Sequence, residues 1–211
     1  AQFWTLNVVE IVRATALAIR RRNELLGPLG PEDAISRELA TVFSRGVTIP
    51  NHWSKAWADL LLGCAQAGVG KADLAEKALQ RALQIRGQYD HPLTGVALLE
   101  LGRLKMEAGD LAAAGSLLTE ASYSAFYYDD LGTIDEAFRI GTMNHLASGA
   151  KTLNLALEPA LNWASRKRYD HLSARLSLAL AEELLELGSL KEAQVALANG
   201  QSRLGEAAKG L

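Results

Sequence analysis

Apolar residues recur along most of the chain at intervals of three and four positions, the spacing of one face of an amphipathic helix. The alternation of apolar and polar residues that would indicate strands is nearly absent. Helix-favouring residues dominate, and the five prolines lie at the edges of the apolar segments. The pattern predicts an all-α chain of about ten helices, with ends good to about two to four residues. The predicted helices cover 3–26, 32–45, 52–68, 71–87, 91–108, 111–127, 131–148, 153–168, 172–187 and 190–208.

A large residue followed by a small one returns about every forty residues along this helical pattern. The pairs are Leu62-Gly63, Leu101-Gly102, Ile140-Gly141 and Leu180-Ala181, and their small residues stand 39, 39 and 40 positions apart. A helix breaker follows seven residues after each small residue, and a further, mostly alanine, position follows five residues after the breaker. These two columns are Gly70, Gly109, Ser148 and Gly188, then Ala75, Ala114, Leu153 and Ala193. A fixed period of this length predicts a stacked array of helix pairs, and the short turns make neighbouring helices antiparallel.

The small residues of the repeat predict close helix contacts. Glycine costs about 1 kcal/mol in a helix interior, so its return at a fixed period is better explained by packing than by chance. We expect a partner helix to approach closely at each of these positions: Gly63, Gly102, Gly141 and Ala181.

The turns repeat as well, and each carries a residue that can cap the helix after it. Asn and Asp side chains accept hydrogen bonds from the free N–H groups of a first helical turn, which is worth about 1 kcal/mol. We predict caps just before the first helix of each pair at Asn51, Asp90, Asp129 and Asp170. Asp110 and Ser189, which follow breaker glycines, are expected to cap second helices.

The combined pattern resembles the tetratricopeptide repeat (TPR). The second unit, with Leu101-Gly102, Gly109 and Ala114, matches the small-residue columns of that family closely. The third unit departs, because Ser148 and Leu153 replace the usual Gly and Ala, so its second helix is expected to be shifted or irregular. The resemblance implies a right-handed superhelical array of antiparallel helix pairs. We expect one continuous domain, with four TPR-like repeats in 51–211 and a degenerate pair in 1–50 that forms a cap or a divergent repeat.

Composition narrows the classes of protein. The 211 residues are 49% hydrophobic and 22% charged, with a formal net charge of −2, which argues against a nucleic-acid partner. No apolar run is long enough to span a membrane. The single cysteine, Cys64, lies on the apolar face of the repeat and is expected to be buried and inert. The chain begins with Ala1 and not with Met, so we expect an excised domain or a processed product, and we expect a cytoplasmic location.

Candidate chemistry is sparse. Three of the four histidines, His52, His91 and His171, fall in the turn column. A metal ladder is disfavoured, because stacked helices lie about 10 Å apart, whereas zinc needs ligands at about 2 Å. No phosphate-binding loop, HExxH motif or nucleophile elbow is present. We therefore expect no metal, no cofactor and no catalytic residue.

The resemblance places the first helix of each pair on a concave surface that binds a partner. The predicted partner-binding residues are Trp57, Leu60, Arg103, Glu107, Phe138, Thr142, His145, Arg175, Glu182 and Glu186. The family's Lys/Asn/Arg clamp for a terminal carboxylate is not supported, because the early positions hold Leu60 and Cys64. The aromatic cluster Tyr123, Phe126, Tyr127 and Tyr128 is interpreted as inter-repeat core, with an exposed contact patch as the alternative.

These observations favour a non-catalytic scaffold that binds a peptide or protein segment in its concave groove. The alternative is a ligand-sensing regulatory domain of a larger multidomain protein, and an enzyme is the least favoured class. The last predicted helix has an apolar side that is expected to cap the array or to contact a second copy of the chain.

Overall fold

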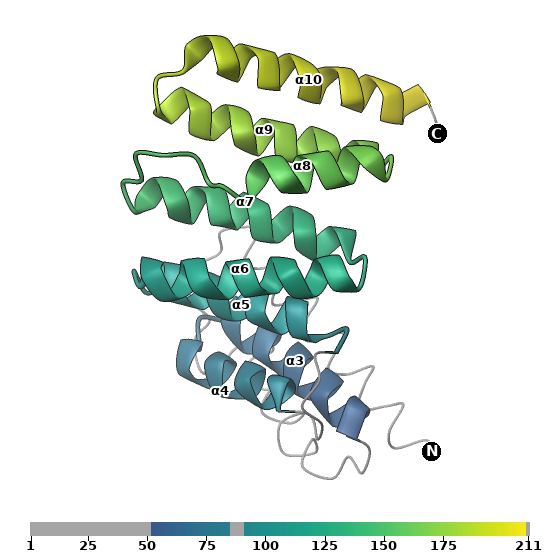
Figure 1. Ribbon diagram of the computed structural model, residues 1–211. Helices are drawn as coiled ribbons and strands as arrows, with labels where there is room; N and C mark the ends of the chain where they lie inside the picture. The colour runs from purple at the N-terminus through teal and green to yellow at the C-terminus, as the bar shows by residue number, and fades with distance from the viewer. Residues whose placement is uncertain (1–51, 85–90, 210–211) are drawn as a thin grey trace. The chain divides into compact units, whose positions relative to one another are not determined.

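The computed structural model describes residues 52–84 and 91–209, which contain eight α-helices and no strand (Figure 1). The all-α prediction is confirmed for this part of the chain. The two helices predicted in 1–50 lie outside the described residues. The helices are α3 (His52–Gly68), α4 (Ala72–Leu83), α5 (Thr94–Glu107), α6 (Leu111–Tyr127), α7 (Leu131–Ala147), α8 (Leu157–Arg166), α9 (Asp170–Glu186) and α10 (Leu190–Lys209).

The chain forms two compact units, the first ending at Leu104 and the second beginning at Lys105. In the first unit α3 packs against α4. In the second unit α6 packs against α7, α9 packs against α7 and α8, and α10 packs against α9 (Figure 1). Each unit is therefore built from helices that pack on their neighbours. The superhelical twist stays a prediction.

Glycines close the regular helix pairs. Gly70, Gly109 and Gly188 adopt φ values of 77°, 81° and 77°, a left-handed conformation that glycine enters without steric cost. Three residues then join α3 to α4, α5 to α6 and α9 to α10. The prediction that these three glycines end the preceding helix is therefore confirmed.

The third pair, α7 and α8, is irregular. Ser148 keeps a right-handed helical conformation, and the left-handed position passes to Gly149, with φ 71°. Nine residues, 148–156, then join α7 to α8. The helix predicted to start at 153 begins four residues later, at Leu157, so the shift expected for this second helix is confirmed. The reason is that Leu153 does not enter α8 but packs against the α9–α10 cluster of Ala181, Leu184, Ala193 and Ala196.

The predicted caps are only partly correct. Asp110 accepts a hydrogen bond from the backbone N–H of Ala113 at 3.1 Å, so its cap is confirmed. At α7 the cap is Asp130 instead of Asp129, because Asp129 takes the left-handed position, with φ 52°, that ends α6.

Asp170 is not a cap either. It is the first residue of α9, the cap position is Tyr169, and no side chain bonds the free N–H groups there. The Asp170 carboxylate instead accepts a long hydrogen bond from Arg203 at 3.4 Å. The predicted caps at Asn51 and Asp90 lie outside the described residues.

The small residues that recur in the repeat lie in two different environments. A Cβ atom on Gly63 would lie 2.6 Å from Cγ of Leu79 on α4, so a close helix contact is confirmed there. A Cβ atom on Gly141 would meet nothing within 4 Å, so the predicted contact at this position is wrong. Gly102 and Ala181 are buried. The missing contact at Gly141 belongs to the irregular third pair.

The largest described core lies in the second unit and joins α6, α7, α8 and α9. Ile134, Leu157 and Leu176 are fully enclosed in it. Phe126 stacks edge-on against Phe138 and Trp163 at centroid distances of 6.2 and 4.8 Å. Phe126 is therefore core, as predicted.

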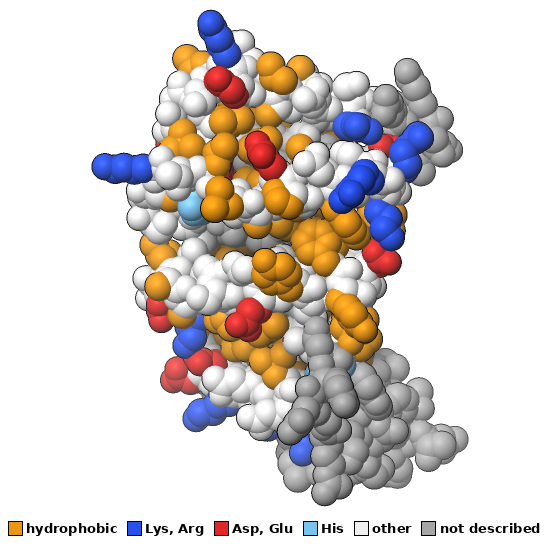
Figure 2. Space-filling view, viewed as in Figure 1, with side chains coloured by type: hydrophobic (Ala, Val, Ile, Leu, Met, Phe, Trp, Pro, Cys, Tyr) orange, Lys and Arg blue, Asp and Glu red, His pale blue; other side chains and the backbone are white. Residues whose placement is uncertain are grey.

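Two tyrosines of the same predicted cluster are not core. Tyr123 and Tyr127 are 69% and 79% exposed, which contradicts the core interpretation for these two residues. Figure 2 shows apolar side chains gathered on the face where α6 and α8 lie. In the described part of the chain, no helix is both long and apolar enough to cross a membrane.

Candidate functional site

Two first helices of the second unit, α7 and α9, pack side by side, and a small open cavity of about 110 Å³ lies between them. Its floor is apolar and includes the buried side chains of Phe138 and Leu176. A wider hollow of about 540 Å³ lies at the start of α7 and at the turn before α9. Asp135 and Arg175 line both cavities, so the two form one surface, which we call the α7–α9 surface.

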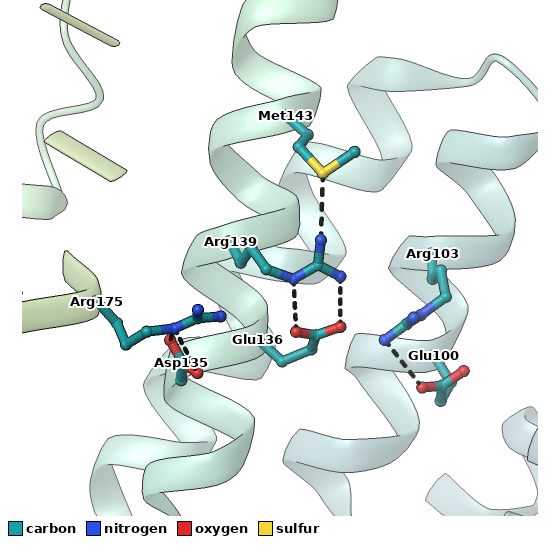
Figure 3. A network of polar contacts seen from close by, with 7 residues as sticks. All are labelled: Glu100, Arg103, Asp135, Glu136, Arg139, Met143 and Arg175. Carbon is teal, nitrogen blue, oxygen red and sulfur yellow. Dashed lines mark hydrogen bonds and ion pairs between the residues drawn. The ribbon is translucent and has the colours of Figure 1, made fainter. Parts of the chain in front are cut away.

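An ion pair crosses from α9 to α7 on this surface. Nε of Arg175 donates to the two carboxylate oxygens of Asp135 at 3.1 and 3.2 Å (Figure 3). Both side chains are partly exposed, so the pair adds little to stability, typically 0–1 kcal/mol. The contact uses only Nε of Arg175. The two terminal nitrogens of that guanidinium have no partner among the described residues and can donate to a ligand.

A second arginine is fixed on α7 itself. Arg139 donates through Nε and Nη2 to the two oxygens of Glu136, at 2.7 and 2.6 Å, in a bidentate pair one helical turn apart (Figure 3). This hydrogen-bonded pairing with Glu136 raises the pKa of Arg139 above its usual value. Nη1 of Arg139 lies 3.5 Å from Sδ of Met143. The guanidinium is thus held in one orientation before any ligand arrives.

The side chains of the α7–α9 surface are of the kinds that bind a peptide segment. It offers two oriented guanidinium groups, the carboxylates of Asp135 and Glu182, and an apolar floor. Such a surface can bind a segment that carries both charge signs and an apolar side chain. Among the described residues, no group of three or more His, Cys, Asp or Glu side chains could hold a metal ion.

Comparison with solved structures gives close matches of fold. A variant of a Podosopora anserina putative kinesin light chain with nearly identical TPR-like repeats matches with a TM-score of 0.69 and 18% identity, over 94% of this chain and 96% of that chain. A second structure of a Podosopora anserina putative kinesin light chain with nearly identical TPR-like repeats matches with a TM-score of 0.65 and 18% identity, over 93% of this chain and 96% of that chain. BtubC (BKLC) from P. vanneervenii matches with a TM-score of 0.63 and 13% identity, over 100% and 88%.

The chain has a TPR-like repeat fold. No protein-family model and no curated protein matches its sequence. The spacing of the small residues predicted a TPR-like fold. Structural similarity to these proteins, at sequence identities of 18% or less, confirms that prediction.

The ten residues predicted to bind a partner in this TPR-like array differ in exposure. Five are exposed: Trp57, Glu107, Arg175, Glu182 and Glu186. Two are half-buried: Arg103 and His145. Three are buried, which corrects their expected display on the surface: Leu60, Phe138 and Thr142. The side chains of these three residues pack between helices. Of the three, only Phe138 lines the α7–α9 surface, as part of its floor.

The structure brings some of the ten together. Phe138, Arg175 and Glu182 line the same cavity. Trp57 and Leu60 belong to α3 of the first unit. Arg103, on α5 of the first unit, pairs with Glu100 one turn earlier at 3.5 Å, a pair that Figure 3 also draws. Whether any of these residues binds a partner stays a prediction.

Asp135 and Arg139 were missed by the sequence interpretation. A signal for Asp135 was present, because Asp135 and Arg175 are 40 residues apart, which is one period of the repeat. Opposite charges at the same position of successive repeats are brought together when the repeats stack. A signal for Arg139 was its distance of three residues from Glu136 on one helix.

Cysteine and histidine have ordinary environments in this TPR-like fold. Cys64 is half-buried, whereas a buried side chain was expected. His91 is buried, and its Nδ1 accepts a hydrogen bond from the backbone N–H of Leu93 at 3.2 Å. His171 is exposed. The local bond of His91 supports a structural role in its turn.

Proposed function

We propose that this chain is a non-catalytic interaction scaffold whose α7–α9 surface binds a peptide or protein segment. The TPR-like fold supports the general class of a protein-interaction scaffold. The location of the binding surface rests on one observation, the Asp135–Arg175 pair that spans α7 and α9 over the buried Phe138.

The preferred ligand is a segment with an apolar side chain next to a carboxylate. The terminal nitrogens of Arg175 are donors at the rim, and guanidinium groups bind carboxylates with two parallel hydrogen bonds. Glu182 on the same rim pairs with a positive side chain of the segment. Because both arginines are already oriented, little side-chain entropy is lost on binding.

The test starts from peptides selected on the full chain. A library of random 12-residue peptides is displayed and selected against the immobilised protein, and the Kd of the enriched peptides is measured by fluorescence anisotropy. Arg175→Glu is expected to weaken binding by about tenfold or more, since one rim donor becomes a repelling carboxylate. Lys191→Glu, an exposed reversal on α10, is the matched control and leaves Kd unchanged.

A charge swap separates the two roles of Arg175. The double variant Asp135→Arg/Arg175→Asp restores a cross-helix pair but moves the guanidinium to α7. If the surface binds as proposed, the swap does not restore peptide binding. Selected peptides that bind the wild type, Arg175→Glu and Lys191→Glu equally well would contradict the proposal.

A further inference from the structure

A third cavity, of about 200 Å³, lies beside the irregular third pair, between α6, α7 and the 148–156 connection. Two glycines, Gly115 and Gly141, contribute walls without side chains. The cavity is large enough for several water molecules, each of which takes about 30 Å³ in the liquid. A small organic group fits the same volume.

The cavity follows from the shift of α8. In the first pair, Leu79 of the second helix fills the space beside Gly63. In the third pair, no atom lies within 4 Å of a Cβ built on Gly141. Leu153 is drawn away to the α9–α10 cluster, and α8 begins only at Leu157. The space that a second helix fills in the first pair is left open here.

An unused hydrogen-bond acceptor belongs to the wall of this cavity. Asn144 is 6% exposed, and its Nδ2 donates to the backbone carbonyl of Leu111 at 3.0 Å. That bond fixes the orientation of the amide, because a carbonyl can only accept. Oδ1 of Asn144 is buried and has no partner. A buried acceptor without a partner is unfavourable unless a ligand or water satisfies it.

An unused donor belongs to the same wall. Oδ1 of Asn154 accepts from the backbone N–H of Ala156 at 3.0 Å, which fixes this second amide with Nδ2 free. The backbone N–H of Asn154 donates to the buried carboxylate of Glu183 at 2.7 Å, which holds the connection in place. Among the described residues, Nδ2 of Asn154 has no hydrogen-bond acceptor.

The ligand that complements these groups is neutral. No Asp, Glu, Lys or Arg side chain lines the cavity, so a charged ligand would lose its hydration without a countercharge. Nε2 of His145 is already bonded to the carbonyl of Thr152 at 2.7 Å. The hydroxyls of Thr119 and Ser122 already donate to backbone carbonyls, and these oxygens and Nδ1 of His145 can only accept further bonds. The two side-chain amides offer Oδ1 of Asn144 as an acceptor and Nδ2 of Asn154 as a donor, both without a partner among the described residues. A primary carboxamide, which has an N–H donor and a C=O acceptor, matches both.

We propose that this cavity binds a primary carboxamide, either that of a small free amide or that of a Gln or Asn side chain in a bound peptide. Its amide N–H donates to Oδ1 of Asn144, and its carbonyl accepts from Nδ2 of Asn154. The apolar part of the ligand lies against Leu118 and Phe138. The cavity shares Phe138 with the α7–α9 surface but none of its charged residues, so it can act as a ligand sensor without the binding of a segment at that surface.

The first experiment compares three probes of similar size on the full chain: propionamide, propionate and propylamine. Binding is followed by ¹H–¹⁵N NMR, including the side-chain NH₂ signals of Asn144 and Asn154. Propionamide is expected to cause saturable shifts of both signals at millimolar concentration, with a Kd about tenfold or more below those of the charged probes. Equal shifts for all three probes, or no shift with propionamide, would overturn the proposal.

Two variants, Gly141→Leu and Asn154→Ser, test the position of the site, and neither is expected to unfold the protein. Gly141→Leu fills the open space and is expected to abolish propionamide binding while the melting temperature stays the same or rises. Gly205→Leu, at a glycine of α10 that also has open space around its Cβ, is the matched control and binds normally. Asn154→Ser keeps an oxygen for the N–H of Ala156 but removes Nδ2, and is expected to weaken binding about tenfold.

A last arm distinguishes the two sources of the amide. In a peptide selected on the wild-type chain, each Gln and Asn is changed to Glu and Asp. A loss of affinity that appears with the wild type but not with Gly141→Leu assigns the amide to the peptide. Propionamide binding without any such loss assigns the site to a free amide. Arg175→Glu is expected to affect peptide binding and to leave propionamide binding unchanged, so the two proposals fail separately.

Discussion

The first and third helix pairs have the same pattern of a large and a small residue, yet their small residues have opposite environments. A Cβ atom on Gly63 would collide with Leu79 of the second helix, whereas one on Gly141 would enter open space. The difference lies in the connection, three residues in one pair and nine in the other. A small residue in a repeat column permits a close helix contact, but the start of the next helix decides whether the contact forms.

The largest expected effect comes from filling the two positions with the same side chain. Gly63→Leu forces atoms into contact with the buried Leu79 and is expected to lower the free energy of unfolding by about 2–3 kcal/mol. Gly141→Leu is expected to change it by less than about 1 kcal/mol, or to raise it. Urea unfolding followed by circular dichroism measures both. Equal losses would mean that the two pairs pack alike.

A smaller effect is expected where the third pair departs from the pattern. Leu153→Ala removes part of the contact with the α9–α10 cluster, and we expect a loss of about 1–2 kcal/mol, because Leu153 is only half-buried. Leu155→Ala, two residues on, is the control. Its side chain is 89% exposed, and its removal is expected to cost less than about 0.5 kcal/mol. Similar costs for both would refute the anchoring role of Leu153.

The smallest effect concerns the start of α7. Asp130→Ala removes the bonds to the backbone N–H and the hydroxyl of Thr133, and is expected to cost about 1 kcal/mol by thermal unfolding. Asp129→Gly is expected to stay within about 0.5 kcal/mol of the wild type or to stabilise it, since the residue is left-handed. The reverse ranking would place the cap at the residue that the sequence suggested.

Helix ends set by local chemistry could be predicted from the sequence. The end of α3 and both ends of α6 agree with the predicted ones, because Gly70 follows α3, Asp110 caps α6 and the left-handed Asp129 follows α6. The start of α8 could not be predicted, because Leu153 is held by partners on α9 and α10 that lie about thirty or more residues away. Local propensity carries no information about such a contact.

Only part of the partner-binding surface could be predicted, because the sequence does not show which helix faces a neighbouring helix covers. Arg175 and Glu182 were named correctly as exposed residues of first helices. Leu60 and Thr142 were expected on the same surface, but the face that they occupy is covered by packing. Helical periodicity gives the order of side chains around a helix. It does not give the width of the face that a neighbouring helix covers.

The pair between Asp135 and Arg175 has a consequence for how repeats can be rearranged. Repeats that share the pattern of large and small residues still differ in the charges that they carry. The third repeat has a negative side chain and the fourth a positive one in the same column, so the two attract each other when these repeats are neighbours. Exchanging the second and third repeats would separate the two charges and place Val96 in the position of Asp135. The pair therefore favours the third repeat as the neighbour of the fourth.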